Sequence, residues 1–141
     1  GVITEGDYQD PDTSATLQEL SELGWEIASH SDTHRNLLEV QEISPKAIYP
    51  EIKSSLDKIE SAVGIRPITL VLPFGQMTIG DEQIKRSEVQ WVIGINGGNE
   101  YKMSDAYYYV GRSSPAGSAQ DTYNNMKIRF GIEEEGENEE N

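Results

Sequence analysis

The sequence contains no cysteine. This absence excludes a disulfide framework, a thiolate metal site and a cysteine nucleophile. No apolar stretch approaches the roughly 20 residues that a membrane-spanning helix needs, so we expect no membrane span. The chain begins with glycine and not with methionine, and it shows no signal peptide, so we expect a piece of a longer protein.

Basic residues are scarce, because 11 Lys and Arg stand against 25 Asp and Glu, and the net charge is −14. This charge opposes binding to nucleic acid or to an anionic membrane, whereas a neutral or cationic glycan is not repelled. Six glutamates fall within residues 133–141. An acidic run of this kind is typical of a disordered end. We therefore assign residues 1–131 to one domain and residues 132–141 to an acidic disordered tail.

Helix and strand patterns alternate along the chain. Residues 1–12 carry many turn-forming residues, and we expect a loop there. The periodicity predicts helices over 13–23, 45–63, 80–89 and 118–130, and strands over 25–29, 68–72, 91–95 and 107–110. The second helix has the apolar face Ile48, Ile52, Leu56, Ile59 and Val63. This alternation predicts an α/β fold with a parallel sheet.

The chain has two histidines, His30 and His34, and they follow the predicted strand 25–29. Neutral imidazole is the commonest protein ligand for a metal such as zinc. The four-residue spacing alone is common by chance, so surface or capping histidines are the alternative interpretation. A zincin is not favoured, because that motif needs a helix and a Glu directly after the first His, where this chain has Ser31.

The segment from Gly24 to His34 resembles the second motif of the NodB-homology polysaccharide deacetylases, also called carbohydrate esterase family 4. That motif follows a Leu-x-x-Leu helix and has the form Gly-(His/Trp)-Glu-Ile-(Ala/Gly)-(Ser/Asn)-His-(Ser/Thr)-x-x-His. Here the helix contributes Leu17 and Leu20. The later run Leu70–Gly75 resembles the third motif, with Phe74 at a position where the family often has tyrosine. The resemblance extends over roughly residues 13–115.

The resemblance implies a distorted (β/α) barrel, incomplete at its N-terminus, with the site at the carboxyl ends of the strands. It implies metal-assisted hydrolysis of N- or O-acetyl groups on a polysaccharide, with His30 and His34 as ligands and zinc as the expected ion. The backbone N–H of Phe74 would contact the oxyanion. Pro73 would contact substrate, and Asp32 would either line the site or form an Asx turn. The implied partner is an acetylated glycan, and the implied location is extracellular or the cell envelope.

Two parts of the family pattern are missing from the sequence. The first motif, Thr-Phe-Asp-Asp, supplies the base and a metal-binding Asp, and we expect it upstream of residue 1. Asp7, Asp10 and Asp12 are assigned instead to turns and caps. No histidine follows His34 to act as the general acid. We therefore expect the isolated chain to bind metal weakly and to be inactive.

Two other functions remain compatible with the sequence. One is a non-catalytic carbohydrate-binding or scaffold domain on a degenerate deacetylase fold. The other is a flavodoxin-like interaction module in which the histidines are incidental. The oligomeric state and the metal identity do not follow from the sequence.

Overall fold

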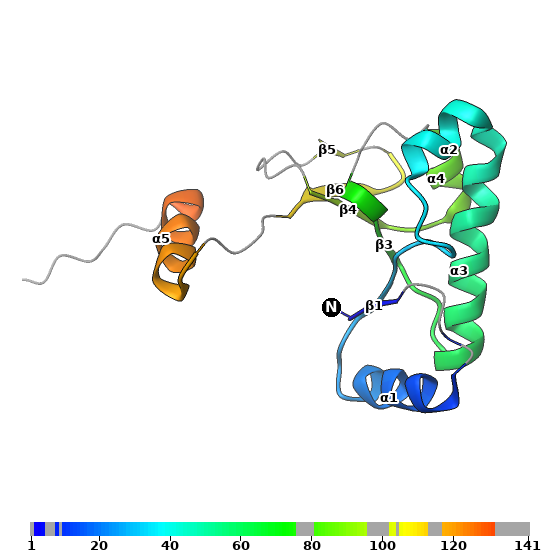
Figure 1. Cartoon of the computed structure of the whole chain (residues 1–141), viewed down its shortest axis with the longest axis horizontal. Helices are drawn as coiled ribbons and strands as arrows, with labels where there is room; N and C mark the ends of the chain where they lie inside the picture. The colour runs from blue at the N-terminus through cyan, green and yellow to red at the C-terminus, as the bar shows by residue number, and fades with distance from the viewer. Residues whose placement is uncertain are drawn as a thin grey trace, which may run out of the picture.

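The computed structural model describes residues 2–4, 8, 10–75, 81–95, 102–103, 105–112 and 117–131. The described strands are β1 Val2–Thr4, β2 Ile27–Ser29, β3 Thr69–Val71, β4 Trp91–Gly94, β5 Lys102–Met103 and β6 Tyr108–Gly111. The described helices are α1 Pro11–Glu22, α2 Leu37–Ile43, α3 Ile48–Val63, α4 Asp81–Ser87 and α5 Ala119–Phe130. Two short 3-10 turns, η1 Pro45–Ala47 and η2 Pro73–Gly75, complete the set (Figure 1). Within these ranges no helix is both long and apolar enough to cross a membrane.

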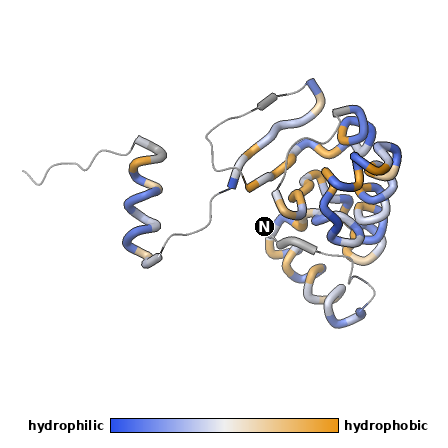
Figure 2. The backbone as a smooth tube through the Cα atoms, turned by 45° about the horizontal axis from the view of Figure 1, so that its top comes forward, coloured by the Kyte–Doolittle hydropathy of each residue, from blue (hydrophilic) through white to orange (hydrophobic). Residues whose placement is uncertain are grey.

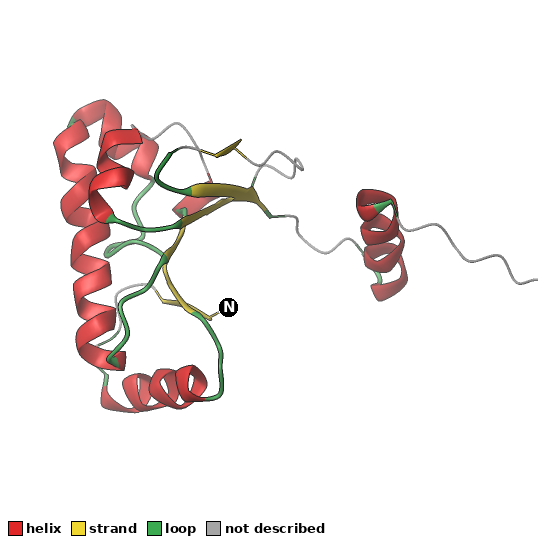
Figure 3. Ribbon diagram, turned by 180° about the vertical axis from the view of Figure 1, so that it is seen from behind, coloured by secondary structure: helices red, strands yellow, loops and turns green. Residues whose placement is uncertain are grey.

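The strands form one sheet in the order β1-β2-β3-β4-β6-β5. Five of them run parallel, and β5 lies antiparallel to β6. Parallel strands that follow one another in the chain are neighbours, and α2, α3 and α4 lie together on one side of them (Figure 3). This is the connectivity of a (β/α) barrel and not of a doubly wound sheet. The predicted parallel α/β architecture is therefore confirmed, although the described sheet is open between β1 and β5.

Helix α3 supplies the largest share of the core. Its apolar residues recur every three or four positions and therefore lie on one side of the helix. All five predicted core residues of this face are buried: Ile48, Ile52, Leu56, Ile59 and Val63. The helix ends at Gly64, whose φ of 83° places it in the left-handed region that glycine tolerates.

The prediction of a loop over residues 1–12 is wrong at residues 2–4, which form β1. Val2 and Ile3 pair in parallel with Ile27 and Ala28 of β2. The turn-forming residues after position 5 made the whole segment look like a loop. The three-residue strand depends on a pairing partner that lies far along the chain. A strand that precedes β2 is therefore part of this chain, and its sequence does not carry the Thr-Phe-Asp-Asp motif.

Helix α1 begins at Pro11, two residues before the start that the sequence pattern predicts. Its cap is Asp10, whose Oδ2 accepts hydrogen bonds from the Thr13 N–H at 2.9 Å and from the Thr13 hydroxyl at 2.7 Å. These bonds hold the pKa of Asp10 below its usual value. Asp12 lies in the first turn of the helix. Asp10 is therefore the cap residue and Asp12 lies inside the helix, whereas Asp7 lies outside the described residues.

Helix α5 confirms the predicted helix over 118–130 and lies apart from the sheet (Figure 1). Ser118 and Asp121 form a capping box at its start, which lowers the pKa of Asp121. Figure 2 shows a mainly hydrophilic helix with hydrophobic positions interspersed, and Tyr123 and Met126 are exposed on it. Residues 132–141 lie outside the described part of the chain, so the tail stays a prediction.

Candidate active site

His30 directly follows β2 at its carboxyl end, and its side chain is only 6% exposed. Its Nδ1 lies 2.8 Å from the carbonyl oxygen of Val71 at the end of β3. A carbonyl oxygen can only accept, so Nδ1 carries the proton and Nε2 carries the lone pair. Metal-binding histidines commonly have one ring nitrogen fixed in this way. The buried bond therefore sets both the tautomer and the orientation of the ring.

The imidazole of His34 lies next to that of His30. The two Nε2 atoms are 3.1 Å apart, and the ring centroids are 4.8 Å apart. Two nitrogens that bind one tetrahedral zinc ion at 2.0–2.1 Å lie about 3.3 Å from each other. The spacing of the two rings thus fits a shared divalent cation. In the described part of the chain no cluster of three or more His, Cys, Asp or Glu could hold a metal, so a third protein ligand would have to lie outside it.

Backbone strain gathers around this histidine pair. Four non-glycine residues of the described chain have positive φ, and three of them are Ser31 at 63°, His34 at 55° and Phe74 at 59°. A left-handed conformation costs a non-glycine residue roughly 1–2 kcal/mol. Such residues persist only where surrounding contacts fix them, and they cluster at functional sites.

The turn η2 follows β3 and faces the histidine loop. Phe74 is 57% exposed as a residue, and the centroid of its ring lies 5.2 Å from that of the His34 ring. Phe74 also borders an open cleft of about 320 Å³, whose other lining residues are His34, Arg35, Asn36, Glu39, Val40 and Ile43. Pro73 is fully buried and does not line this cleft. The oxyanion role of the Phe74 N–H and the substrate contact of Pro73 both stay predictions.

Gly75 closes this turn where there is no room for a side chain. Its φ is 67°, and a Cβ there would lie 2.1 Å from Cγ1 of Ile95. We expect Gly75→Ala to lower the free energy of unfolding by at least about 2 kcal/mol, since backbone strain and overlap add. The matched control is Gly64→Ala, which has similar strain but open space, and should cost only about 1 kcal/mol. Urea denaturation measures both, and equal losses would contradict the expectation.

Asp32 is turned towards α3. Its Oδ1 lies 2.5 Å from Nζ of Lys58, and its Oδ2 accepts a 2.9 Å hydrogen bond from the hydroxyl of Ser54. The side chain is 13% exposed. These bonds give Asp32 a part in holding the loop, and the predicted contact with substrate remains a prediction.

A chain of buried hydroxyls lies beneath the loop, and the sequence patterns did not predict it. Ser29 and Ser55 lie 2.8 Å apart at their Oγ atoms, and the Tyr8 hydroxyl is 3.2 Å from Ser55. Ser55 is a polar residue beside the apolar face of α3, which was the available signal. Helix α2 was not predicted either; Asn36 caps it by accepting a 3.1 Å hydrogen bond from the Leu38 N–H. Seven residues are too few for a periodic pattern, but Asn36 followed by Glu39 resembles a helix start.

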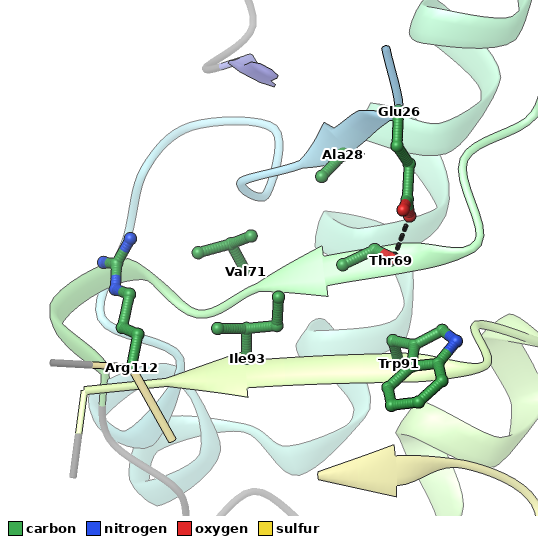
Figure 4. A pocket seen from close by; sticks show the side chains of 7 residues that line it. All are labelled: Glu26, Ala28, Thr69, Val71, Trp91, Ile93 and Arg112. Carbon is green, nitrogen blue, oxygen red and sulfur yellow. Dashed lines mark hydrogen bonds between the residues drawn. The ribbon is translucent and has the colours of Figure 1, made fainter. Parts of the chain in front are cut away.

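A second hollow of about 420 Å³ lies on the other face of the sheet (Figure 4). Successive side chains of a strand alternate between faces, so Ala28 points into it while Ser29 points to α3. At one end Glu26 accepts a hydrogen bond from Thr69, and at the other end lies Arg112. Trp91 borders this hollow and is 37% exposed, and Trp25 is 53% exposed. Both tryptophan side chains therefore reach the surface of the described structure.

The sequence profile of the polysaccharide deacetylase family matches residues 4–87, which is more than half of the chain. The match includes both histidines and the turn η2. The chain belongs to the polysaccharide deacetylase family. The resemblance found in the second and third motifs is thereby confirmed.

Two solved structures support the deacetylase fold. A de-N-acetylase from Aggregatibacter actinomycetemcomitans superposes with a TM-score of 0.60 at 18% identity, over 79% of this chain and 52% of its own. A suspected polysaccharide deacetylase from Mycobacterium smegmatis gives 0.61 at 15% identity, over 79% of this chain and 39% of its own. The chain thus spans about half the length, or less, of these deacetylases. A search of curated proteins found no significant match.

Proposed function

We propose that this chain forms part of a metal-dependent hydrolase that removes acetyl groups from an acetylated polysaccharide. The observation that carries this proposal is the 3.1 Å approach of the Nε2 atoms of His30 and His34 at the carboxyl end of the sheet. Membership of the polysaccharide deacetylase family supports a glycan substrate. From the family alone, we also propose that the protein acts outside the cell or in its envelope.

His30 and His34 are the residues that would hold the ion, for which zinc is our proposal. A bound divalent cation would polarise the acetyl carbonyl and lower the pKa of its water. The hydrogen bond from His30 Nδ1 to Val71 fixes the ring that faces the ion. We assign the oxyanion contact to the backbone N–H of Phe74, next to the ring of His34. The cleft beside Phe74 would receive the glycan.

The third ligand is proposed to come from the segment after β1. In the parallel pair of β1 and β2, Thr4 lies opposite Ser29, so β1 ends at the edge of the sheet where His30 begins its loop. Glu5 and Asp7 follow β1 in the sequence and lie outside the described residues. We expected an inactive fragment because the Thr-Phe-Asp-Asp motif, with its base and its metal-binding Asp, is missing from the sequence. Strand β1 does not carry that motif, and we propose that Glu5 or Asp7 supplies the missing carboxylate in its place.

The test is acetate release from an acetylated chitooligosaccharide by the zinc-loaded chain, with and without chelator. We expect chelator to abolish release, and either Glu5→Gln or Asp7→Asn to lower it at least about tenfold, in the range for loss of a metal-supporting group. Asp10→Asn is the control, because Asp10 caps α1 and should leave the rate unchanged. Release that persists in chelator would contradict metal dependence. Oligosaccharide binding without any release would favour the non-catalytic carbohydrate-binding domain.

A further inference from the structure

One face of α3 contacts the loop that carries the two histidines. The polar residues of this face are Glu51, Ser54, Ser55 and Lys58, and each bonds to the loop or to the residue before it. Their spacing of three and four positions places them in one row along the helix. The row lies beside the apolar face of the same helix, which is buried in the core. The loop is therefore attached to a rigid element.

Glu51 makes the densest set of these contacts. Its Oε1 accepts from the N–H of Thr33 at 2.6 Å and from the Thr33 hydroxyl at 2.7 Å. Its main-chain carbonyl accepts from the N–H of Asp32 at 3.2 Å. A carboxylate accepts hydrogen bonds more strongly than a neutral group does. Thr33 immediately precedes His34, so these bonds act one residue away from an imidazole.

The other members of the row hold the rest of the loop. Lys58 and Ser54 bind the two carboxylate oxygens of Asp32, and Ser55 binds Ser29, the residue before His30. The imidazoles themselves contact β3 and η2 on the other side of the loop. The chain between the two histidines is thus fixed from the side of α3, while the rings meet on the opposite side.

The loop needs such contacts because its backbone is strained. Both Ser31 and His34 adopt left-handed conformations that residues with a side chain rarely adopt. Without external bonds, a short loop with two such residues would relax to ordinary conformations. The imidazoles would then no longer meet at one point.

We propose that Glu51 is a positioning residue, which with Lys58 holds the loop so that His30 and His34 converge and thereby sets the metal affinity. Glu51 acts through Thr33 and is not itself a ligand. This inference rests on the proposed function, since it concerns the same metal site. It adds α3 as the element that determines the geometry of that site.

Titration of the chain with Co²⁺, followed by visible absorbance, tests the proposal. We expect Glu51→Ala to weaken binding at least about tenfold and to change the band shape, as when support for a metal ligand is lost. Glu51→Gln keeps an oxygen acceptor for Thr33 and should lose at most about threefold. The matched control is Glu60→Ala on the same helix, which removes a 2.7 Å ion pair with Arg66 and should leave Co²⁺ binding unchanged.

Two results would overturn the inference: Co²⁺ affinity of Glu51→Ala equal to that of Glu60→Ala, or no recovery in Glu51→Gln. If Glu51→Ala fails to fold, Thr33→Val decides, because it removes one hydrogen bond and should weaken binding about threefold; unchanged binding there would count against the inference. His30→Ala separates the two proposals. If His30→Ala binds Co²⁺ as well as the wild type, the metal site and the inference are both wrong. If His30→Ala loses Co²⁺ binding while Glu51→Ala keeps it, only the inference is wrong.

Discussion

Replacing His30 with alanine is expected to abolish specific metal binding while leaving the chain folded. The substitution removes one of the two imidazoles whose Nε2 atoms lie 3.1 Å apart. Loss of a supporting hydrogen bond typically costs 10–100-fold in metal affinity, so loss of a ligand should cost more than about 100-fold. The variant also loses the bond to Val71, which should lower the free energy of unfolding by only about 1–2 kcal/mol.

Isothermal titration of zinc into the wild type and His30→Ala measures this effect, with circular dichroism to establish folding. The control is Phe74→Ala, which removes a ring next to His34 but no donor atom. We expect its zinc affinity to change less than about threefold, because no coordinating group is lost. Since its backbone N–H remains, acetate release should also persist. Equal zinc affinity in His30→Ala and the wild type would show that the pair is not a metal site.

The largest expected effect on stability comes from Leu56→Ala. Leu56 is fully buried in the middle of α3 and packs with Leu70 and Val92 in the main core. Truncation of a buried leucine removes apolar surface that folding takes out of water, and it leaves a cavity. Together these effects lower the free energy of unfolding by about 2–5 kcal/mol. A loss of this size is a large part of the 5–15 kcal/mol that stabilises a typical domain.

Urea denaturation of Leu56→Ala tests the role of α3 in the core. Leu23→Ala is the control for the same chemical change, because Leu23 is 70% exposed. Its free energy of unfolding should change by less than about 0.5 kcal/mol. Similar losses in the two variants would mean that α3 is not packed as described.

Local patterns in the sequence determined much of this protein. The apolar positions of α3 recur with the period of a helix, so its buried face followed from spacing alone. The two histidines after a strand, and the turn Pro73–Gly75 after another, indicated the place and the kind of the site. The family profile confirmed the resemblance that these motifs carry. The helix period and the motifs are formed by residues close together in the chain, so they can be recognised in the sequence without the structure.

Other features depend on pairs of residues far apart in the chain, and only the tertiary structure decided them. Residues 2–4 look like a loop by themselves and become β1 because β2 offers a hydrogen-bonding edge. The tautomer of His30 follows from the carbonyl of Val71, and the Thr33 N–H of the loop donates to Glu51 of α3. The carboxylate of Asp32 likewise lies against Lys58 of α3, a contact between residues 26 positions apart.

The histidine pair shows most clearly which properties the sequence determines and which the tertiary structure determines. The sequence placed two imidazoles four residues apart, a spacing compatible with many separations in space. Left-handed backbone at Ser31 and His34 turns the rings towards one point, and bonds to α3 and β3 hold them there. Because these contacts link segments far apart in the chain, the residue types came from the sequence and the 3.1 Å separation came from the fold.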